Sequence, residues 1–451
     1  MNPIRKVRNS LLQGDNRSVT VKKNILASLL FKVISIVTSF SLVPLTINYV
    51  SSELYGVWLT LSSILTWIGF MDIGFSQGLK NKLTEAIAKN DWKRGKSLVT
   101  TTYGMMFFMM IPICILLELL IPFVNWTSLL NVDPIYTDEI VRAMYVCIAF
   151  TCLQMIVRVF VSVVAAYQKV ALSDSFGVIG NVLSLIAIAI LTRFCPPSLV
   201  VLACTLAAMP IFVTLIATIF FFNGRFRQVS PNPKYFRKDY VKDLFGLGYK
   251  FFIINIQVLI LFQSTNILIS YVSSPNEVTS YNIAYRLLNC GMMLYTMITS
   301  PLWPAYTDAY TRGDYPWMKN MRNKMSKILL LSILACVFIT ILSPVIYKIW
   351  IGDSAQVPFV MTAMVCVYVA TYCWSSLNGT LLVGMGKIKV NTRICLVGML
   401  LHIPFSLIFG KFIGAYGVVV SMISINLIYA LVQRYQVSLL ISKKAHGIWN
   451  E

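Results

Sequence analysis

Long apolar runs alternate with short polar connections along the whole chain of 451 residues. A helix needs about 20 predominantly apolar residues to cross the hydrocarbon core of a bilayer. Runs of this length predict twelve membrane-spanning helices, and no connection between them is long enough to hold a soluble domain. The predicted spans are residues 24–49, 55–78, 97–123, 139–164, 170–192, 196–222, 244–271, 278–301, 325–350, 356–382, 388–409 and 412–440.

Composition supports an all-α integral membrane protein. Hydrophobic residues make up 57% of the chain and charged residues only 12%. A soluble domain could not bury the apolar surface of such a sequence. The net charge of +21 does not predict a nucleic-acid partner, because the basic residues stand in short connections between apolar runs. The ten cysteines lie almost wholly within those runs, without a Cys-x-x-Cys motif, which predicts packing rather than a metal site or disulfides.

The distribution of Lys and Arg predicts the orientation of the chain. One set of connections, together with both termini, holds 30 of these residues, and the alternate set holds only Arg193, Lys348 and Lys411. Cytoplasmic connections carry the excess of positive charge, so both termini are predicted to be cytoplasmic. The apolar run after the basic residues 1–23 is too long for a signal-peptide core, which predicts that the first span is retained.

A short segment recurs half a chain apart. Residues 84–92, "TEAIAKNDW", and residues 307–315, "TDAYTRGDY", match in kind at six positions with one offset of 223 residues. Both segments follow the second span of their half, and six spans per half bring both halves into the membrane from the same side. This predicts two parallel repeats related by an axis along the membrane normal. The alternative is a chance likeness between two amphipathic cytoplasmic loops.

The repeat divides the chain into five predicted regions. These are a basic cytoplasmic N-terminus (1–23), an N-terminal lobe (24–222), a basic linker (223–243), a C-terminal lobe (244–440) and a cytoplasmic tail (441–451). The stretches around the repeated segment, residues 71–96 and 301–324, are amphipathic and basic. Each predicts an interfacial helix on the cytoplasmic leaflet, with anionic membrane lipid as its partner.

The basic residues predicted to lie in mid-membrane are Lys32, Arg158, Lys250 and Arg286. A charge at membrane depth is costly unless it faces a partner or a wet cavity. We therefore expect a water-filled cavity whose cations attract an anionic substrate group such as a phosphate. The alternative is that these side chains extend to the membrane surface. Asp72, nearer the cytoplasmic end of its span, is a coupling or gating candidate, or alternatively a helix-end partner.

Polar residues in three spans recur at helical spacing, so that each set shares one face of its helix. The first and seventh spans are equivalent members of the two halves, which favours a cleft between the lobes. The alternative is that the stripes are helix-packing interfaces. The polar residues predicted to line the cavity are Ser28, Ser35, Asn255, Asn266, Asn282 and Asn289.

Motifs of enzymes are missing from the sequence. His402 lies in a span and His446 in the tail, so the two histidines form no dyad or metal site. There is no Walker sequence or Gly-rich phosphate loop, which excludes ATP as the direct energy source. The sequence predicts a transporter without a cofactor rather than an enzyme.

The twelve-span pattern and one stretch resemble a known family. Residues 53–106 read "ELYGVWLTLSSILTWIGFMDIGFSQGLKNKLTEAIAKNDWKRGKSLVTTTYGMM". They resemble the second span and following loop of the Wzx-type O-antigen flippases, a polysaccharide branch of the multidrug/oligosaccharidyl-lipid/polysaccharide exporter superfamily. The resemblance covers the whole chain in architecture and is sharpest at Tyr55–Trp58, Asp72–Gly74, Gly78–Lys82 and Glu85.

The resemblance implies a function and a place in the cell. It implies that undecaprenyl-diphosphate-linked O-antigen or polysaccharide repeat units move from the cytoplasmic to the periplasmic leaflet of the bacterial inner membrane. It further implies V-shaped lobes around a cationic cavity, with Lys32, Asp72, Arg158 and Arg286 as functional positions. Alternating access would be driven by a counter-ion, H⁺ or Na⁺, or by the membrane potential. Polysaccharide assembly proteins are expected partners.

Two other functions stay open. A multidrug or small-cation exporter of the same superfamily would place buried carboxylates in the cavity, where this chain offers chiefly cations. A membrane polysaccharide polymerase or transferase would need a catalytic histidine or an acidic pair in a sizeable outer loop. The longest outer connection, residues 124–138, is short and holds only scattered carboxylates.

Overall fold

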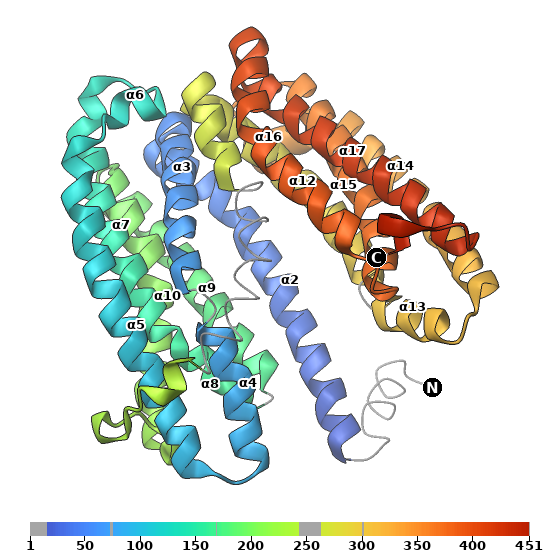
Figure 1. Cartoon of the computed structure of the whole chain (residues 1–451). Coiled ribbons are helices and arrows are strands. Elements are labelled where there is room, and N and C mark those ends of the chain that lie inside the picture. Colours follow the sequence, from blue (N-terminus) through green and yellow to red (C-terminus); the bar gives the residue numbers. More distant parts are fainter. Residues whose placement is uncertain (1–15, 73–74, 168, 243–262, 300–301, 451) are drawn as a thin grey trace, which may run out of the picture. The chain divides into compact units, whose positions relative to one another are not determined.

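The computed structural model describes residues 16–72, 75–167, 169–242, 263–299 and 302–450, and these contain helices but no strand. Figure 1 shows their arrangement. The α-helices of the N-terminal half are α2 (Asn16–Val50), α3 (Ser52–Gly69), α4 (Phe75–Ala88), α5 (Trp92–Leu120), α6 (Trp126–Leu130), α7 (Thr137–Val157), α8 (Val159–Ala166), α9 (Val170–Phe194) and α10 (Leu199–Asn223). Those of the C-terminal half are α12 (Pro275–Thr299), α13 (Leu302–Thr311), α14 (Tyr315–Trp350), α15 (Phe359–Gly384), α16 (Lys389–Ile413) and α17 (Ala415–Ile441).

The all-helical membrane fold predicted from hydropathy is confirmed. Within the described residues, nine spans are long and apolar enough to cross a membrane. The predicted spans 55–78 and 278–301 correspond to α3 and α12, which fall outside those nine. The predicted span 244–271 lies mostly outside the described residues, although 263–272 are helical. The total of twelve spans and the cytoplasmic termini remain predictions.

One predicted boundary differs from the structure. The second span was expected to run to residue 78, but α3 ends at Gly69 and α4 begins at Phe75. The predicted span 139–164 lies within a single candidate span, Pro134–Ala166, in which Arg158 stands between α7 and α8.

The chain forms two compact units. The first unit contains Met1–Val50, Leu65–Trp126 and Pro134–Ile256, and the second contains Ser51–Ile64, Thr127–Asp133 and Gln257–Glu451. The predicted lobes, 24–222 and 244–440, have other bounds than these units: Ser51–Ile64 and Thr127–Asp133 group with the second unit, and the first unit runs to Ile256. The lobes remain a prediction.

Close backbone contact explains why the start of α3 belongs to the second unit. A Cβ atom at Gly56 would lie 1.8 Å from the carbonyl oxygen of Pro275, so only glycine permits this approach of α3 to α12. The Thr279 hydroxyl donates a hydrogen bond of 2.7 Å to the Ser52 carbonyl. The other segment is held similarly, since the Ser270 hydroxyl donates to the Leu130 carbonyl at 2.7 Å.

The same packing order recurs in both units. In the first unit α10 packs on α7 and α9, and α5 packs on α7. In the second unit α17 packs on α15 and α16, and α14 packs on α15. Helices at equivalent positions of the two halves therefore make equivalent contacts, as two parallel repeats require.

The repeated sequence segment forms the same turn twice. The Asp91 amide donates to the Ala86 carbonyl at 2.9 Å, and the Asp314 amide donates to the Ala309 carbonyl at 2.8 Å. These donors and acceptors are each related by the offset of 223 residues found in the sequence. Both bonds close the same kind of helix C-terminus, with a left-handed residue (Asn90 or Gly313) just before the donor, as the predicted repeat expects.

Each turn ends in an aspartate that caps the next helix. The Asp91 carboxylate accepts a hydrogen bond of 2.9 Å from the Arg94 amide at the start of α5. The Asp314 carboxylate accepts one of 3.0 Å from the Trp317 amide at the start of α14. In both cases the side chain satisfies an amide that has no partner within its helix.

Replacing either capping aspartate should destabilise its unit. We expect Asp91→Ala and Asp314→Ala each to cost about 1 kcal/mol, and Asp314→Asn to cost much less because asparagine also caps. Thermal unfolding of the purified variants measures this. Asp353→Ala, at an exposed position outside any cap, is the control. Equal midpoints for Asp314→Ala and the wild type would show that the cap contributes nothing.

The apolar faces of α4 and α13 are covered by protein rather than by lipid. Leu79, Leu83 and Ala86 are fully buried, and α4 packs against α5 and α8. Tyr306 and Ala309 of α13 are also buried, and α13 packs against α15 and α14. An amphipathic period does not distinguish a protein core from a bilayer, so these buried faces are explained by packing. Anionic membrane lipid as a partner of the two helices remains a prediction.

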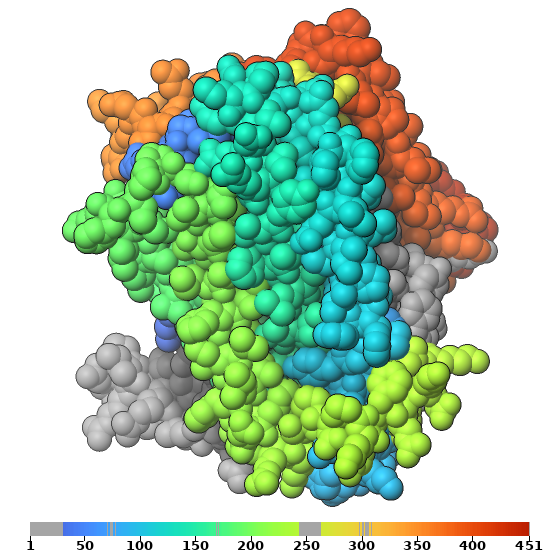
Figure 2. Space-filling model, turned by 90° about the vertical axis from the view of Figure 1, so that its left-hand side faces the viewer, coloured from blue at the N-terminus to red at the C-terminus, as the bar shows by residue number. Residues whose placement is uncertain are grey.

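The basic linker lies against the start of α5. The Thr100 hydroxyl accepts from the Asn232 amide at 3.0 Å, and the Thr101 hydroxyl accepts from the Arg237 amide at 3.1 Å. Lys96 lies over the Tyr235 ring at 5.0 Å. In Figure 2 this segment (yellow-green) covers one end of the first unit beside the blue α4–α5 region. The linker therefore folds into short turns on this unit.

Candidate functional site

Asp72 and Arg158 lie near each other in the first unit. Both carboxylate oxygens of Asp72 accept from the Ser76 amide, at 3.2 and 3.3 Å, which places Asp72 at the start of α4. Arg158 is exposed between α7 and α8, close enough to interact electrostatically with that carboxylate. Asp72 thus has the helix-end role that was its alternative interpretation. Coupling or gating by Asp72 remains a prediction.

The predicted residues of the first span lie on α2. Lys32 is exposed and Ser35 is partly exposed, and α2 packs against α9. Among the described residues no carboxylate forms a salt bridge with Lys32. The side chain of Ser28, together with Lys250 and Asn255, lies outside the described part of the chain.

An amide network joins three helices of the second unit. The Asn282 amide nitrogen on α12 donates to the Asn266 side-chain oxygen at 2.8 Å. The Asn266 amide nitrogen donates to the Ser63 hydroxyl on α3, also at 2.8 Å. These bonds hold the helices together, as the packing alternative for the polar stripes expects. Substrate contacts by Asn266 and Asn282 remain a prediction.

Arg286 lies one turn beyond Asn282 on α12. It is half-buried and interacts electrostatically with the Tyr55 hydroxyl of α3. Asn289 follows on the same helix, and its side-chain oxygen is buried without a hydrogen-bond donor. Buried acceptors normally have a donor, so this oxygen is available to a water or to a hydroxyl of a ligand. A cation and an open acceptor therefore lie within one turn of each other.

A ladder of tyrosines in the same unit was missed in the sequence. The rings of Tyr281 and Tyr285 are stacked at 5.9 Å between centroids. Tyr285 contacts Tyr368 at 6.3 Å, and Tyr368 contacts Tyr372 at 6.4 Å. The sequence signal for this cluster was the spacing of four residues between Tyr281 and Tyr285 and between Tyr368 and Tyr372, because residues four apart share a helix face. Tyrosine combines an apolar face with a hydrogen-bonding tip, which suits contact with hydroxylated ligands.

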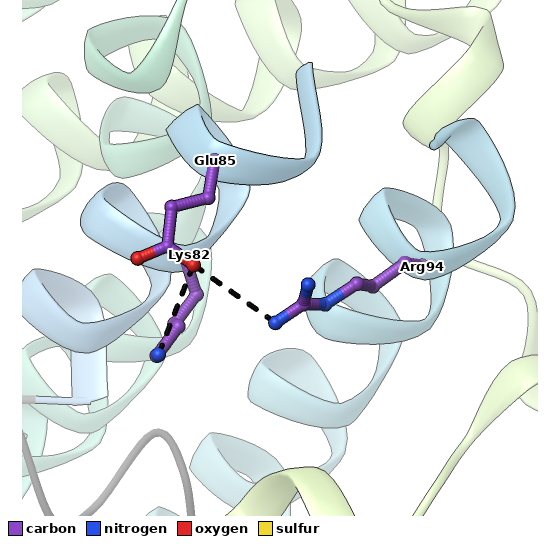
Figure 3. Close-up of polar contacts among 3 residues, drawn as sticks. All are labelled: Lys82, Glu85 and Arg94. Atoms are coloured by element: carbon purple, nitrogen blue, oxygen red, sulfur yellow. Dashed lines mark ion pairs between the residues drawn. The ribbon is translucent and has the colours of Figure 1, made fainter. Parts of the chain in front are cut away.

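Glu85, one of the resemblance positions, connects α4 to α5. Its carboxylate lies 3.8 Å from the Lys82 ammonium and 4.0 Å from the Arg94 guanidinium, as Figure 3 shows. Both pairs are solvent-exposed, so each contributes no more than about 1 kcal/mol. Thr84 adds a hydrogen bond of 3.2 Å to the Ala166 carbonyl at the end of α8. This segment therefore fixes the arrangement of α4, α5 and α8.

No group of side chains within the described residues could hold a metal ion. His402 is fully buried, and its Nδ1 lies 3.3 Å from the Ser421 hydroxyl and 3.4 Å from the Ser406 hydroxyl. The Ser421 contact joins α16 to α17, the Ser406 contact lies within α16, and neither includes a carboxylate or thiol. His402 therefore has a packing role in the described structure.

Comparisons with known proteins give a family and a fold. The family model described as "Polysaccharide biosynthesis protein" matches residues 21–310, more than half of the chain. No curated protein sequence matches the chain. Several solved structures are similar to this chain, and the three described below share 14–16% of its sequence.

Three of these structures illustrate the range of similarity. An inward-facing multidrug resistance MATE family transporter of the MOP superfamily has a TM-score of 0.71 at 15% identity, over 93% of this chain and 96% of that chain. An outward-facing transporter of this kind has a TM-score of 0.60 at 16% identity, over 96% and 98%. A MOP superfamily transporter from Pyrococcus furiosus, whose title describes a binding pocket of reverse polarity, has a TM-score of 0.54 at 14% identity, over 97% and 98%.

Proposed function

The chain belongs to the polysaccharide biosynthesis protein family, and from this membership we propose that it is a lipid-linked oligosaccharide flippase. Its fold is that of the MATE transporters of the MOP superfamily. The proposed substrate is an undecaprenyl-diphosphate-linked O-antigen or polysaccharide repeat unit. The proposed reaction is its movement from the cytoplasmic to the periplasmic leaflet of a bacterial inner membrane.

One observation carries this proposal: the family match spans the four cationic positions predicted to lie in mid-membrane. Residues 21–310 include Lys32, Arg158, Lys250 and Arg286. A diphosphate is the part of the substrate that lipid disfavours most, and Lys and Arg are the side chains that compensate its charge. The half-buried Arg286 and the open acceptor of Asn289 supply contacts for a phosphate and for a sugar hydroxyl.

The proposed cycle is alternating access, in which the charged head group occupies a hydrated site while the polyprenyl tail stays in lipid. A counter-ion gradient of H⁺ or Na⁺, or the membrane potential, would drive it. Asp72 is the proposed coupling or gating carboxylate, because the Arg158 guanidinium lies near it at the break between α7 and α8. Polysaccharide assembly proteins are proposed partners on either side of this step.

A multidrug or small-cation exporter is the second candidate, favoured by the similarity to multidrug transporters. That similarity, at 15% identity, concerns the fold alone. A cationic substrate would be repelled by Lys32 and Arg286, whereas a diphosphate is attracted. A polymerase or transferase would need a catalytic cluster, for which the sequence offers no candidate.

Purified protein in vesicles tests the proposal directly. We expect a fluorescent undecaprenyl-diphosphate oligosaccharide to move from the inner leaflet, so that a membrane-impermeant quencher reaches it. Protein-free vesicles should keep the inner-leaflet share protected. Efflux of a cationic dye without movement of the glycolipid would favour the exporter. A new covalent product would favour an enzyme, and either outcome would overturn the flippase.

A further inference from the structure

The tyrosine ladder of α12 and α15 combines two buried rings with two partly exposed ones. Tyr281 and Tyr368 are only 5% and 1% exposed, whereas Tyr285 and Tyr372 are partly exposed. The Tyr285 ring lies 5.9 Å from the Tyr281 ring and 6.3 Å from the Tyr368 ring, measured between centroids. The Tyr372 ring lies 6.4 Å from the Tyr368 ring. The buried rings therefore hold the two partly exposed rings at fixed positions.

Polar residues extend the partly exposed face on α12. Asn289 follows Tyr285 by four residues and Arg286 by three, so these side chains share one side of the helix. All three are partly exposed, and the Asn289 side-chain oxygen has no hydrogen-bond donor. Leu294 and Ile298, which are 64% and 47% exposed, lie on the opposite side of α12. The apolar side suits lipid, whereas the side with an arginine and an asparagine suits water or a polar ligand.

Hydroxyl side chains extend the same face on α15, which packs against α12. Ser376 and Thr380 follow Tyr372 at intervals of four residues, and all three are partly exposed. The Thr380 hydroxyl donates 2.9 Å to the Ser376 carbonyl, which leaves the lone pairs of the hydroxyl oxygen for another donor. These positions extend over about 12 Å of helix. The face is therefore long enough for more than one sugar ring.

Side chains of these kinds recognise carbohydrate. A pyranose ring has a face of C–H groups, which packs on an aromatic ring, and a rim of hydroxyls, which pair with amides and hydroxyls. A bare phosphate would leave the aromatic rings unused. A polyprenyl chain would cover the amide and the hydroxyls without pairing them, which costs free energy. The chemistry of this face therefore matches the glycan better than the other parts of a lipid-linked oligosaccharide.

We propose that this face, the tyrosine platform, binds the glycan of the lipid-linked substrate. Its residues are Tyr285, Asn289, Tyr372, Ser376 and Thr380. This inference rests on the proposed function, in which Arg286 binds the diphosphate. Because Arg286 is the neighbour of Tyr285 in the chain, the sugar attached directly to the diphosphate is placed on the Tyr285 ring. The sugars that follow are placed along α15.

Two lipids that differ only in the sugar test the platform. The probes are undecaprenyl diphosphate and undecaprenyl-diphosphate N-acetylglucosamine, and native mass spectrometry of the purified full chain measures the affinity for each. The wild type should bind the glycosylated lipid about tenfold more tightly. Tyr285→Leu and Tyr372→Leu should each lower this preference about fivefold, because an aromatic contact is lost. Their affinity for the lipid without sugar should stay unchanged.

Three further variants separate sugar binding from folding. Tyr435→Leu is the matched control, since it removes a 55% exposed ring on α17 outside the platform and should leave the preference unchanged. Tyr285→Phe should lower the preference less than Tyr285→Leu does, because it keeps the ring. Asn289→Ala leaves the ladder intact and should lower the preference about fivefold through one lost acceptor. It therefore tests the platform even where a leucine variant fails to fold.

Several results would overturn the proposal. One is equal binding of the two lipids by the wild type. Another is an equal loss of affinity for both lipids in Tyr285→Leu and Tyr372→Leu, which would leave the tyrosines with a packing role alone. The third is an equal effect of Tyr285→Leu and Tyr435→Leu on the preference.

This experiment is independent of the vesicle assay. A sugar preference that depends on Tyr285, in a protein that moves no glycolipid, would retain the glycan site and remove the flippase function. Movement of glycolipid by a protein that binds both lipids equally would retain the function and remove the site.

Discussion

Gly56→Ala is expected to destabilise the second unit by about 3 kcal/mol, a cost typical of severe overpacking. The added Cβ would lie 1.8 Å from the carbonyl oxygen and 2.5 Å from the carbonyl carbon of Pro275. Both atoms belong to the backbone at the start of α12, so no change of rotamer relieves the clash. The α3 and α12 helices would have to separate, and the bond from Thr279 to Ser52 would be lost with them.

Gly177→Ala is the matched control for this prediction. Gly177 is also a helical glycine, on α9, and a Cβ atom there would meet nothing within 4 Å. Alanine is the better helix former by about 0.8–1 kcal/mol, so Gly177→Ala should raise the unfolding midpoint or leave it unchanged. Thermal unfolding of both purified variants measures the difference. Equal midpoints for Gly56→Ala and Gly177→Ala would show that the close approach of α3 to α12 is not essential.

Helix positions followed from the sequence because apolar runs of membrane length leave few alternatives. The predicted span 170–192 became α9, Val170–Phe194, and the span 388–409 became α16, Lys389–Ile413. The offset of 223 residues found in the sequence also relates the hydrogen bond of the Asp91 amide to that of the Asp314 amide. Such features depend on local patterns, which a single sequence contains.

Features that depend on neighbouring helices could not be read from the sequence. The apolar face of α4 is amphipathic by sequence, but its burial against α5 and α8 is a tertiary contact. Asn282 was singled out by its helical stripe, yet its partner Asn266 lies on another helix.

Arg286→Gln and Lys32→Gln are each expected to lower glycolipid transport about 10- to 100-fold. The reason is that one charge-assisted contact to a phosphate contributes about 1.5–3 kcal/mol, and each 1.4 kcal/mol is a factor of ten. Arg286 lies on α12 between Asn282 and Asn289, and Lys32 is exposed on α2 without a salt-bridge partner among the described residues. Surface polysaccharide in cells and glycolipid movement in vesicles measure the loss.

Protein level and two further variants separate a transport defect from a folding defect. The amount of membrane-inserted protein should equal that of the wild type, since glutamine removes charge while keeping a polar side chain. Lys348→Gln removes an exposed cation near the end of α14 and should leave transport unchanged. Arg286→Lys should retain part of the activity, because lysine keeps the charge but loses the paired donors of arginine. Wild-type polysaccharide in both Arg286→Gln and Lys32→Gln would remove these residues from the transport site, since a diphosphate at membrane depth requires positive charge beside it.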